Sequence, residues 1–438
     1  MMFTLTQKMT MGVGVLSLVA SSMVQADAIN NKHNFEFKTR FIHFDREFDN
    51  SAQNRDQSAI GYILNYQSPQ FSHLIGVNLS GYYLAELDHS GSNNEDILTR
   101  ESDGDLSGFS QIGEAYINVT PLKNLSIKVG RQQHHSLLFI SNGSRAVPNT
   151  YRGININYQA KNHLQFYGAV YDEFSRRARD TFEEFSTDQS EEGSIDYVSV
   201  LGLKYATNQL LVELENFTAD EYLTKFGLRA SYLIPFEHSK LKIIGGIFTS
   251  ADDGDLFVTG AENGDLDDED AIGSVVGETS SNNDGLGGFV DFVWSKDPSE
   301  WSLAYTKIEE IWLEDNFAGY HGPNPFPTDA RVGPDLTNSG ENVVRLKYKY
   351  DWHNTIPGLT TTFSAAYGWD AENSEDSSLG QADENWNEIE VRYKVPQIKN
   401  LQVRGIWHQY TSDEFGQVDG VKPDQEDFRL YVDYTYRF

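Results

Sequence analysis

The last eleven residues of the chain alternate apolar and polar side chains at every step and end on an aromatic residue. Alternation with a period of two is the pattern of a β-strand whose two faces lie in different environments. A wall with lipid outside and water inside provides such environments, so this segment predicts a strand of an outer-membrane β-barrel. The apolar face carries Phe428, Leu430, Val432, Tyr434, Tyr436 and Phe438, and the other carries Arg429, Tyr431, Asp433, Thr435 and Arg437.

The composition fits a barrel better than a soluble secreted protein. The mean hydropathy is −0.50, and 39% of the residues are hydrophobic. Because only every second residue of a barrel strand faces lipid, low overall hydropathy is compatible with a membrane protein. Aromatic residues make up 13% of the chain, which suits the girdles at the two membrane interfaces.

The N-terminus has the pattern of a secretory signal peptide. Lys8 precedes an apolar run from Met11 to Ala20, and Val24-Gln25-Ala26 precedes Asp27. The run is shorter than the roughly 20 residues that a spanning helix needs, which disfavours a membrane anchor. We expect residues 1–26 to be removed, leaving residues 27–438 as a single barrel domain.

Charge and cysteine content exclude several classes of function. The net charge is −31, which makes nucleic acid an unlikely partner because phosphates repel it. The chain has no cysteine, so thiolate catalysis and thiolate metal sites are impossible. We expect no cofactor.

Two kinds of connection alternate between the predicted strands. Eight are short, and nine others are mostly longer and acidic or Gly-rich, as expected for periplasmic turns and outward loops. Nine loops joined by eight turns require eighteen strands, so we predict an all-β, antiparallel, up-and-down barrel with strands such as 72–85 and 386–395. The turns lie near 68–71, 121–124, 160–162, 207–209, 235–239, 297–300, 352–358 and 396–400, and the loops near 46–58, 86–110, 132–149, 172–194, 219–222, 250–286, 309–341, 371–385 and 411–426.

Basic residues recur at the predicted inward positions of the strands, whereas the loops hold most of the acidic residues. A series of inward cations is typical of a track along which an anionic group, most simply a carboxylate, passes. The alternative is that lumen-facing positions are polar in any barrel, and a slip of one residue would turn the series outward. The basic ladder consists of Arg40, Lys128, Arg229, Arg345, Lys347, Arg392, Arg404 and Arg429.

The third long loop and its flanks carry a recognisable pattern. The chain reads Val129-Gly-Arg-Gln-Gln-His-His-Ser-Leu-Leu-Phe-Ile-Ser-Asn142 and then Ser144-Arg-Ala-Val-Pro-Asn-Thr-Tyr-Arg-Gly153. This resembles the OprD family of substrate-specific porins, in which a Gly-Arg-x-x-Pro-x-Thr-Phe-Arg-Gly stretch returns a constriction loop to the wall. Further similar segments are Phe37–Arg46, Ile356–Leu359, Asn387–Tyr393 and Arg429–Tyr434.

The resemblance implies an eighteen-stranded barrel in a bacterial outer membrane, with the third loop folded inward. It also implies a basic ladder on one wall, acidic or hydroxyl groups opposite, and recognition of the strand ending at Phe438 by the barrel-assembly machinery. The chain departs from the family pattern at His134-His135 and at Gly322-Pro-Asn-Pro-Phe-Pro327. Both lie where substrate preference is set, so no substrate is transferred.

No metal site is predicted. Adjacent imidazoles in an extended chain point apart, so His134 and His135 cannot chelate one ion together. Asp252, Asp253 and Asp255 are clustered carboxylates of the type that calcium prefers, but they lack the spacing of a calcium loop.

An inward loop narrows a pore, so its polar groups act strongly on a passing solute. For Arg145 and Arg152 the alternative is that they anchor the loop to the wall by pairing with carboxylates. For the acidic residues of the seventh loop the alternative is that they are part of a hydrated surface loop. The acidic residues are proposed to bind a solute's ammonium group. The candidate constriction residues are Arg131, Ser141, Asn142, Arg145 and Arg152 of the third loop and Glu309, Glu310 and Asp315 of the seventh.

These features predict a passive channel selective for small carboxylate-bearing nutrients, such as amino acids or organic acids. An oligosaccharide channel is the alternative, with Tyr62, Tyr82, Tyr116 and Tyr431 as an aromatic slide. An outer-membrane enzyme is a remote alternative, because no serine lies in a recognisable nucleophile motif. Expected partners are small solutes, outer-membrane lipid and lipopolysaccharide, with the protein a monomer or weak trimer.

Overall fold

The computed structural model describes residues 32–49, 51–187, 194–256, 284–312, 316–320, 322–372, 380–412 and 423–438. The expected signal peptide, residues 1–26, lies outside the described residues. No helix in the described part of the chain is long and apolar enough to cross a membrane.

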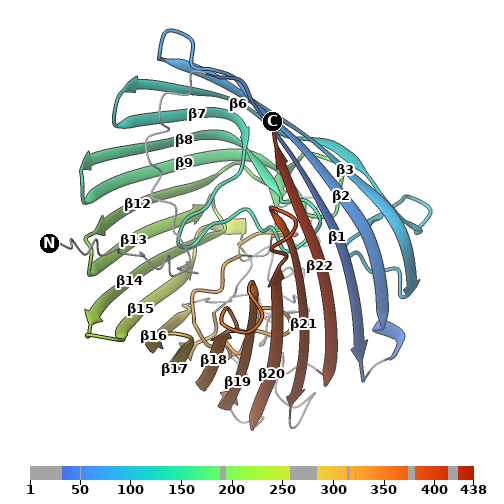
Figure 1. Cartoon of the computed structure of the whole chain (residues 1–438), viewed down its shortest axis with the longest axis vertical. Coiled ribbons are helices and arrows are strands. Elements are labelled where there is room, and N and C mark those ends of the chain that lie inside the picture. Colours follow the sequence, from blue (N-terminus) through green and yellow to red (C-terminus); the bar gives the residue numbers. More distant parts are fainter. Residues whose placement is uncertain are drawn as a thin grey trace, which may run out of the picture.

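Eighteen antiparallel strands form a closed barrel, which confirms the predicted strand count. The ring closes between the last strand and the first, from Glu36 opposite Arg437 to Phe48 opposite Gln425, and Figure 1 shows β22 lying beside β1. The strands are β1 (Asn34–Phe48), β2 (Arg55–Gln67), β3 (Ile75–Gly91), β6 (Ser110–Leu122), β7 (Leu125–Gln132), β8 (Thr150–Lys161), β9 (Leu164–Ser175), β12 (Val198–Ala206), β13 (Leu210–Ala219), β14 (Leu223–Pro235), β15 (Lys240–Asp252), β16 (Leu286–Lys296), β17 (Ser299–Glu310), β18 (Asn342–Asp351), β19 (Leu359–Glu372), β20 (Gln381–Lys394), β21 (Leu401–Ser412) and β22 (Gln425–Arg437).

Several strands are longer than the sequence indicated. β3 continues to Gly91, and β20 begins at Gln381. The added residues are mostly polar, because the strands continue to pair beyond the apolar alternation that marked them in the sequence. Shorter elements form in the loops: η1 (Ser51–Gln53), the pair β4 (Thr99–Arg100) and β5 (Leu106–Ser107), and the pair β10 (Glu183–Ser186) and β11 (Ser194–Ile195).

The predicted alternation of β22 is present in the structure. Phe428 and Tyr436 are exposed on the outer face, whereas Asp427 and Tyr431 are buried on the inner face. Other strands of the barrel carry the same outer apolar belt, which matches the lipid-facing surface of a membrane barrel. Its members on β14 to β19 include Phe226, Ile247, Phe292, Leu303, Leu346 and Phe363.

Loops fill much of the barrel interior, and the third loop is not the only one that folds inward. Phe139 of the third loop packs near Tyr320 of the seventh, with ring centroids 5.4 Å apart, and both belong to a buried cluster that includes Phe185 of the fourth loop. Ile97 and Leu98 of the second loop are also fully buried. Figure 1 shows the teal segment between β7 and β8 and the orange segment between β17 and β18 inside the ring of strands.

The second and fourth loops were expected to point outward, and for their buried parts that expectation was wrong. The seventh loop, which was expected to contribute residues to the constriction, also has buried parts inside the barrel. Each of these loops contains large apolar side chains, and burying such a side chain is favourable by about 1.5–3 kcal/mol relative to leaving it in water. Acidic residues flank these side chains, so each segment as a whole has the composition of a solvated loop.

Candidate functional site

The third loop, residues 133–149, is held by a buried carboxylate of the barrel wall. Glu215 on β13 is 1% exposed. It accepts hydrogen bonds from the Ser136 hydroxyl (2.8 Å), the Leu137 and Leu138 backbone N–H groups (2.9 and 2.8 Å) and the Tyr167 hydroxyl (2.5 Å). A carboxylate satisfied by several donors fixes the position of the groups that it binds. Glu215 therefore determines how far the loop reaches across the lumen.

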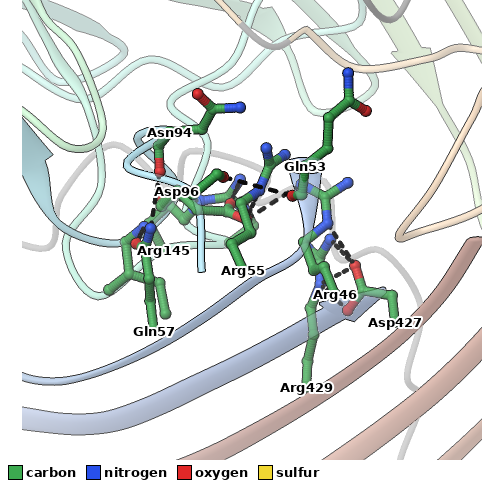
Figure 2. A network of polar contacts seen from close by, with 12 residues as sticks. Arg46, Gln53, Arg55, Gln57, Asn94, Asp96, Arg145, Asp427 and Arg429 are labelled. Carbon is green, nitrogen blue, oxygen red and sulfur yellow. Dashed lines mark hydrogen bonds and ion pairs between the residues drawn. The ribbon is translucent and has the colours of Figure 1, made fainter. Parts of the chain in front are cut away.

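A second buried carboxylate joins the second and third loops to the wall. Asp96 of the second loop contacts Arg145 at 2.5 Å, Arg46 at 3.1 Å and Arg55 at 3.2 Å. Figure 2 shows these groups converging, with Gln57 beside them donating to the Asn94 carbonyl at 2.8 Å. We call Asp96, Arg46, Arg55 and Arg145 the loop latch.

The charges of the loop latch keep Asp96 ionised. Burial alone would raise the pKa of this carboxyl, but Arg145, Arg46 and Arg55 hold it well below its usual value. The cluster continues to β22, where Asp427 accepts from Arg429 at 2.6 Å and contacts Arg46 at 3.1 Å. Guanidinium groups outnumber carboxylates here, so this part of the wall is positively charged.

Arg145 was a candidate for the constriction, and the structure places it in the loop latch, which is the anchoring role considered as its alternative. Ser141 is buried, and its hydroxyl accepts from the backbone N–H of His134 at 3.0 Å. Asn142 accepts from the backbone N–H of Ser144 at 2.8 Å. These bonds shape the third loop from within.

Arg131 and Arg152 do not face the lumen. Arg152 lies two residues before the exposed Ile154, its side chain is 45% exposed, and it pairs with Asp172 and Glu173 at 2.8 and 2.7 Å. Arg131 lies on the face of the exposed Val129 and stacks on the Phe182 ring at 3.9 Å. Side chains two residues apart share a face of a strand. The spacing of Arg131 from Val129 and of Arg152 from Ile154 therefore indicated, already in the sequence, that both arginines face outward.

The seventh loop, between β17 and β18, contributes different residues from those predicted. Arg331 contacts Glu388 at 2.7 Å and Glu390 at 2.5 Å on β20. Neither wall acid nor Arg331 was selected from the sequence. Glu309 and Glu310 are instead exposed at the end of β17, and Asp315 lies outside the described residues.

All members of the basic ladder occupy inward positions, but most of them are neutralised by partners. The acidic partners are Asp433 for Arg40 (2.6 Å), Glu213 for Arg229 (2.7 Å), Asp291 for Arg345 (3.5 Å), Glu390 for Arg392 (3.1 Å) and Asp427 for Arg429 (2.6 Å), while Lys128 lies 5.1 Å from the Tyr116 ring centroid. Arg345 also donates to the Pro327 carbonyl of the seventh loop. Several ladder members therefore act as supports for loops.

Three ladder cations, Lys128, Arg404 and Lys347, differ from the others. The Arg404 guanidinium stacks on the buried Tyr431 ring at 3.9 Å, and none of the three side chains makes a hydrogen bond or ion pair with any described residue. Arg404 lies directly across from Arg392 on β20. Like charges facing each other on neighbouring strands destabilise a sheet.

The proposed aromatic slide is not continuous along the lumen. Tyr62 lies on the outer face, where its ring centroid is 6.1 Å from those of Phe37 and Tyr83. Tyr82 and Tyr431 are buried. Within the described ranges no three His, Asp or Glu side chains are grouped so as to hold a metal ion.

Replacing Glu215 by glutamine should loosen the third loop. The amide cannot accept from all the donors that now bind the carboxylate, and each hydrogen bond to a charged group contributes about 1.5–3 kcal/mol. We expect larger and noisier ionic conductance in planar bilayers. Glu213→Gln is the matched control, because Glu213 pairs with Lys204 and Arg229 and does not contact the loop. Equal conductance changes in the two variants would contradict this role of Glu215.

Replacing Asp96 by asparagine should weaken the loop latch, since it leaves guanidinium groups buried without their counter-charge, at a cost of about 3–5 kcal/mol. Thermal unfolding in detergent measures this loss, and Asp433→Asn, which removes a more exposed acid, should cost less. Because the folded pKa of Asp96 is depressed, its contribution is present above the usual aspartate pKa and is lost only as pH falls through the lower folded value. An equal loss of stability in both variants would contradict the latch.

Comparisons with known proteins agree with this architecture. Residues 30–438 match the family described as outer membrane porin, OprD family. The fold is similar to that of OccK9 (OpdG) from Pseudomonas aeruginosa, with a TM-score of 0.78 and 20% identity over 94% of this chain and 100% of that one. OpdK from the same organism, solved with vanillate, has a TM-score of 0.78 and 18% identity over 94% of this chain and 100% of that one.

OccAB3 from Acinetobacter baumannii gives a TM-score of 0.78 and 19% identity over 93% of this chain and 99% of that chain. No curated protein sequence matches the chain. The similar structures share the fold, and the family match extends over nearly all of the described residues. The chain therefore belongs to the OprD family of outer-membrane porins.

Proposed function

We propose that this porin mediates passive, selective diffusion of small carboxylate-bearing solutes, such as organic acids or amino acids. The observation that carries the proposal is Arg404, an inward guanidinium without a hydrogen-bond acceptor among the described residues. Its donors are available to a solute, whereas those of Arg40 and Arg429 are engaged by carboxylates.

The neighbourhood of Arg404 favours an anion. Arg392 faces it across the β20–β21 pair, and Glu390, the acid nearest to Arg392, is shared with Arg331. A carboxylate arriving between Arg392 and Arg404 relieves their repulsion, and a guanidinium matches both of its oxygens. Tyr431 supports the Arg404 plane and fixes its orientation.

Lys347 on β18 provides a second position for the anion. Its inward ammonium is half-buried, and the charges that act on it are mostly positive, from Arg345, Arg331 and Lys349, with Glu300 opposing them. Cations at separated positions along a pore let an anion bind and leave in steps, which conduction requires. The similar porin OpdK was solved with vanillate, an aromatic carboxylate, and this supports the same chemical class for the solute here.

The predictions about export, membrane partners and assembly remain proposals. We propose that residues 1–26 are an export signal, that lipopolysaccharide surrounds the outer rim, and that the strand ending at Phe438 is recognised during assembly. Sugar transport has no supporting observation, because the aromatic slide is interrupted. The family and fold are those of porins, and we propose no catalytic activity.

The test is Arg404→Gln, which removes the charge and keeps a polar side chain of similar reach. Reversal potentials in a salt gradient should show a loss of anion preference of about 2–3-fold, because the free cation contributes most to the field in the pore. Arg229→Gln is the control, since Glu213 already neutralises that arginine. Unchanged selectivity in the Arg404 variant, or an equal effect in both, would mean that the free guanidinium does not select the solute.

A further inference from the structure

The seventh loop ends in a buried pair of carboxyl groups. Glu341, at the end of the loop, is fully buried, and Glu384 on β20 is 1% exposed. One amide nitrogen, Nδ2 of Asn338, donates to Glu341 Oε2 at 2.8 Å and also to Glu384 Oε1. The Asn338 backbone N–H donates to Glu341 at 2.9 Å, and the Tyr410 hydroxyl donates to Glu384. The loop is thus joined to β20 and β21 through two acids.

The charges around Glu341 are mostly negative. The donors named above are neutral, and Glu341 Oε1 is buried without a hydrogen-bond partner. Lys307 of β17 is the cation that acts on Glu341, but its ammonium donates to the Gly340 carbonyl at 2.6 Å. Glu310 of β17 and Glu372 of β19 lie beside Ser339 and Gly340 and add negative charge. Burial, and then Glu384, raises the pKa of Glu341 well above its usual value.

A second acid pair lies within the same loop. Asp329 lies beside Asp335, and Asp329 Oδ1 is buried without a partner. Burial, then Asp335, then Glu388 of β20 raise the pKa of Asp329 well above its usual value, and Arg345 of β18 only partly opposes them. Two carboxyl groups in contact keep one proton between them, because like charges so close cannot both be ionised.

We propose that these two carboxyl pairs hold the seventh loop in its inward position only while each pair keeps a proton, so that the channel is narrower in acid and wider in alkali. The proton is the ligand, and the segment that changes position is the part of the loop between the two carboxyl pairs, residues 329–341. Arg331, Phe326 and the Pro327 carbonyl remain as further contacts with the wall, so loss of the protons widens the pore without releasing the whole loop.

The direction follows from the raised pKa values. Below the ordinary carboxyl pKa, both the inward and the released loop are protonated and the inward position has its full stability. As pH rises, the released state loses its protons first, and the stabilisation is lost as pH passes through the raised values. This inference goes beyond the proposed solute class, because it concerns conductance and not selectivity.

The experiment is single-channel conductance in planar bilayers, in potassium chloride, from pH 5 to pH 9. We expect the native channel to increase in conductance by about twofold with rising pH, because its narrowest part is set by loops inside the lumen. Glu384→Gln and Asp335→Asn each replace one acid of a pair by a neutral amide, which removes the like charge beside the acid that remains. Each should reduce the pH dependence, and the double variant should reduce it most, because only burial then raises the pKa of Glu341 and Asp329.

Glu36→Gln is the matched control. It removes an inward acid near the periplasmic end that pairs with Lys38 and Arg437, away from the seventh loop, and should leave the pH dependence unchanged. Formation of channels shows that each variant has folded. A native conductance that does not change with pH would overturn the proposal, as would a double variant with native pH dependence. Neither result bears on Arg404, so the two proposals fail separately.

Discussion

Pairing between the first and last strands is the interaction on which the rest of this structure depends. Lipid offers no hydrogen-bond partner, so a sheet in a membrane is stable only when its two edges bond to each other. β1 and β22 satisfy this requirement along their whole common length, from Glu36 to Phe48 on one strand. Closure places one set of alternating side chains in lipid and the other in the lumen, and this division creates every site described above.

Within the lumen, buried carboxylates hold the loops in position. Glu215 holds the third loop, Asp96 joins the second and third loops to the wall, and Glu388 with Glu390 binds Arg331 of the seventh loop. An excess of acidic residues in a chain of net charge −31 suggests a merely solvated surface. Some of that excess instead fixes loops, and in doing so it neutralises most of the cations along the wall. The proposed selectivity then depends on the few cations that are left free.

The amino-acid sequence was sufficient for the strand count and for the two faces of β22, since these depend on the alternation of turns and loops and on periodicity. It was not sufficient at the ends of β7 and β8, because Arg131 and Arg152 face outward. It could not identify which ladder cations are free. Arg404 and Arg429 look equivalent in sequence, but Arg429 has Asp427 two residues away on the same face, and Arg404 has an aromatic ring instead. Asp96 lies in an acidic loop and looked solvated, because its arginine partners come from β1, β2 and the third loop. Such pairings depend on the folding of long loops, for which local pattern carries little information.

The most direct measurement is the uptake of a carboxylate and a matched neutral solute by liposomes containing the native protein. Benzoate and benzamide have nearly the same size and shape and differ in charge. An inward guanidinium with free donors predicts faster entry of benzoate, with the difference decreasing as salt screens the charge. Equal rates, or faster entry of benzamide at low salt, would contradict a lumen selective for carboxylates.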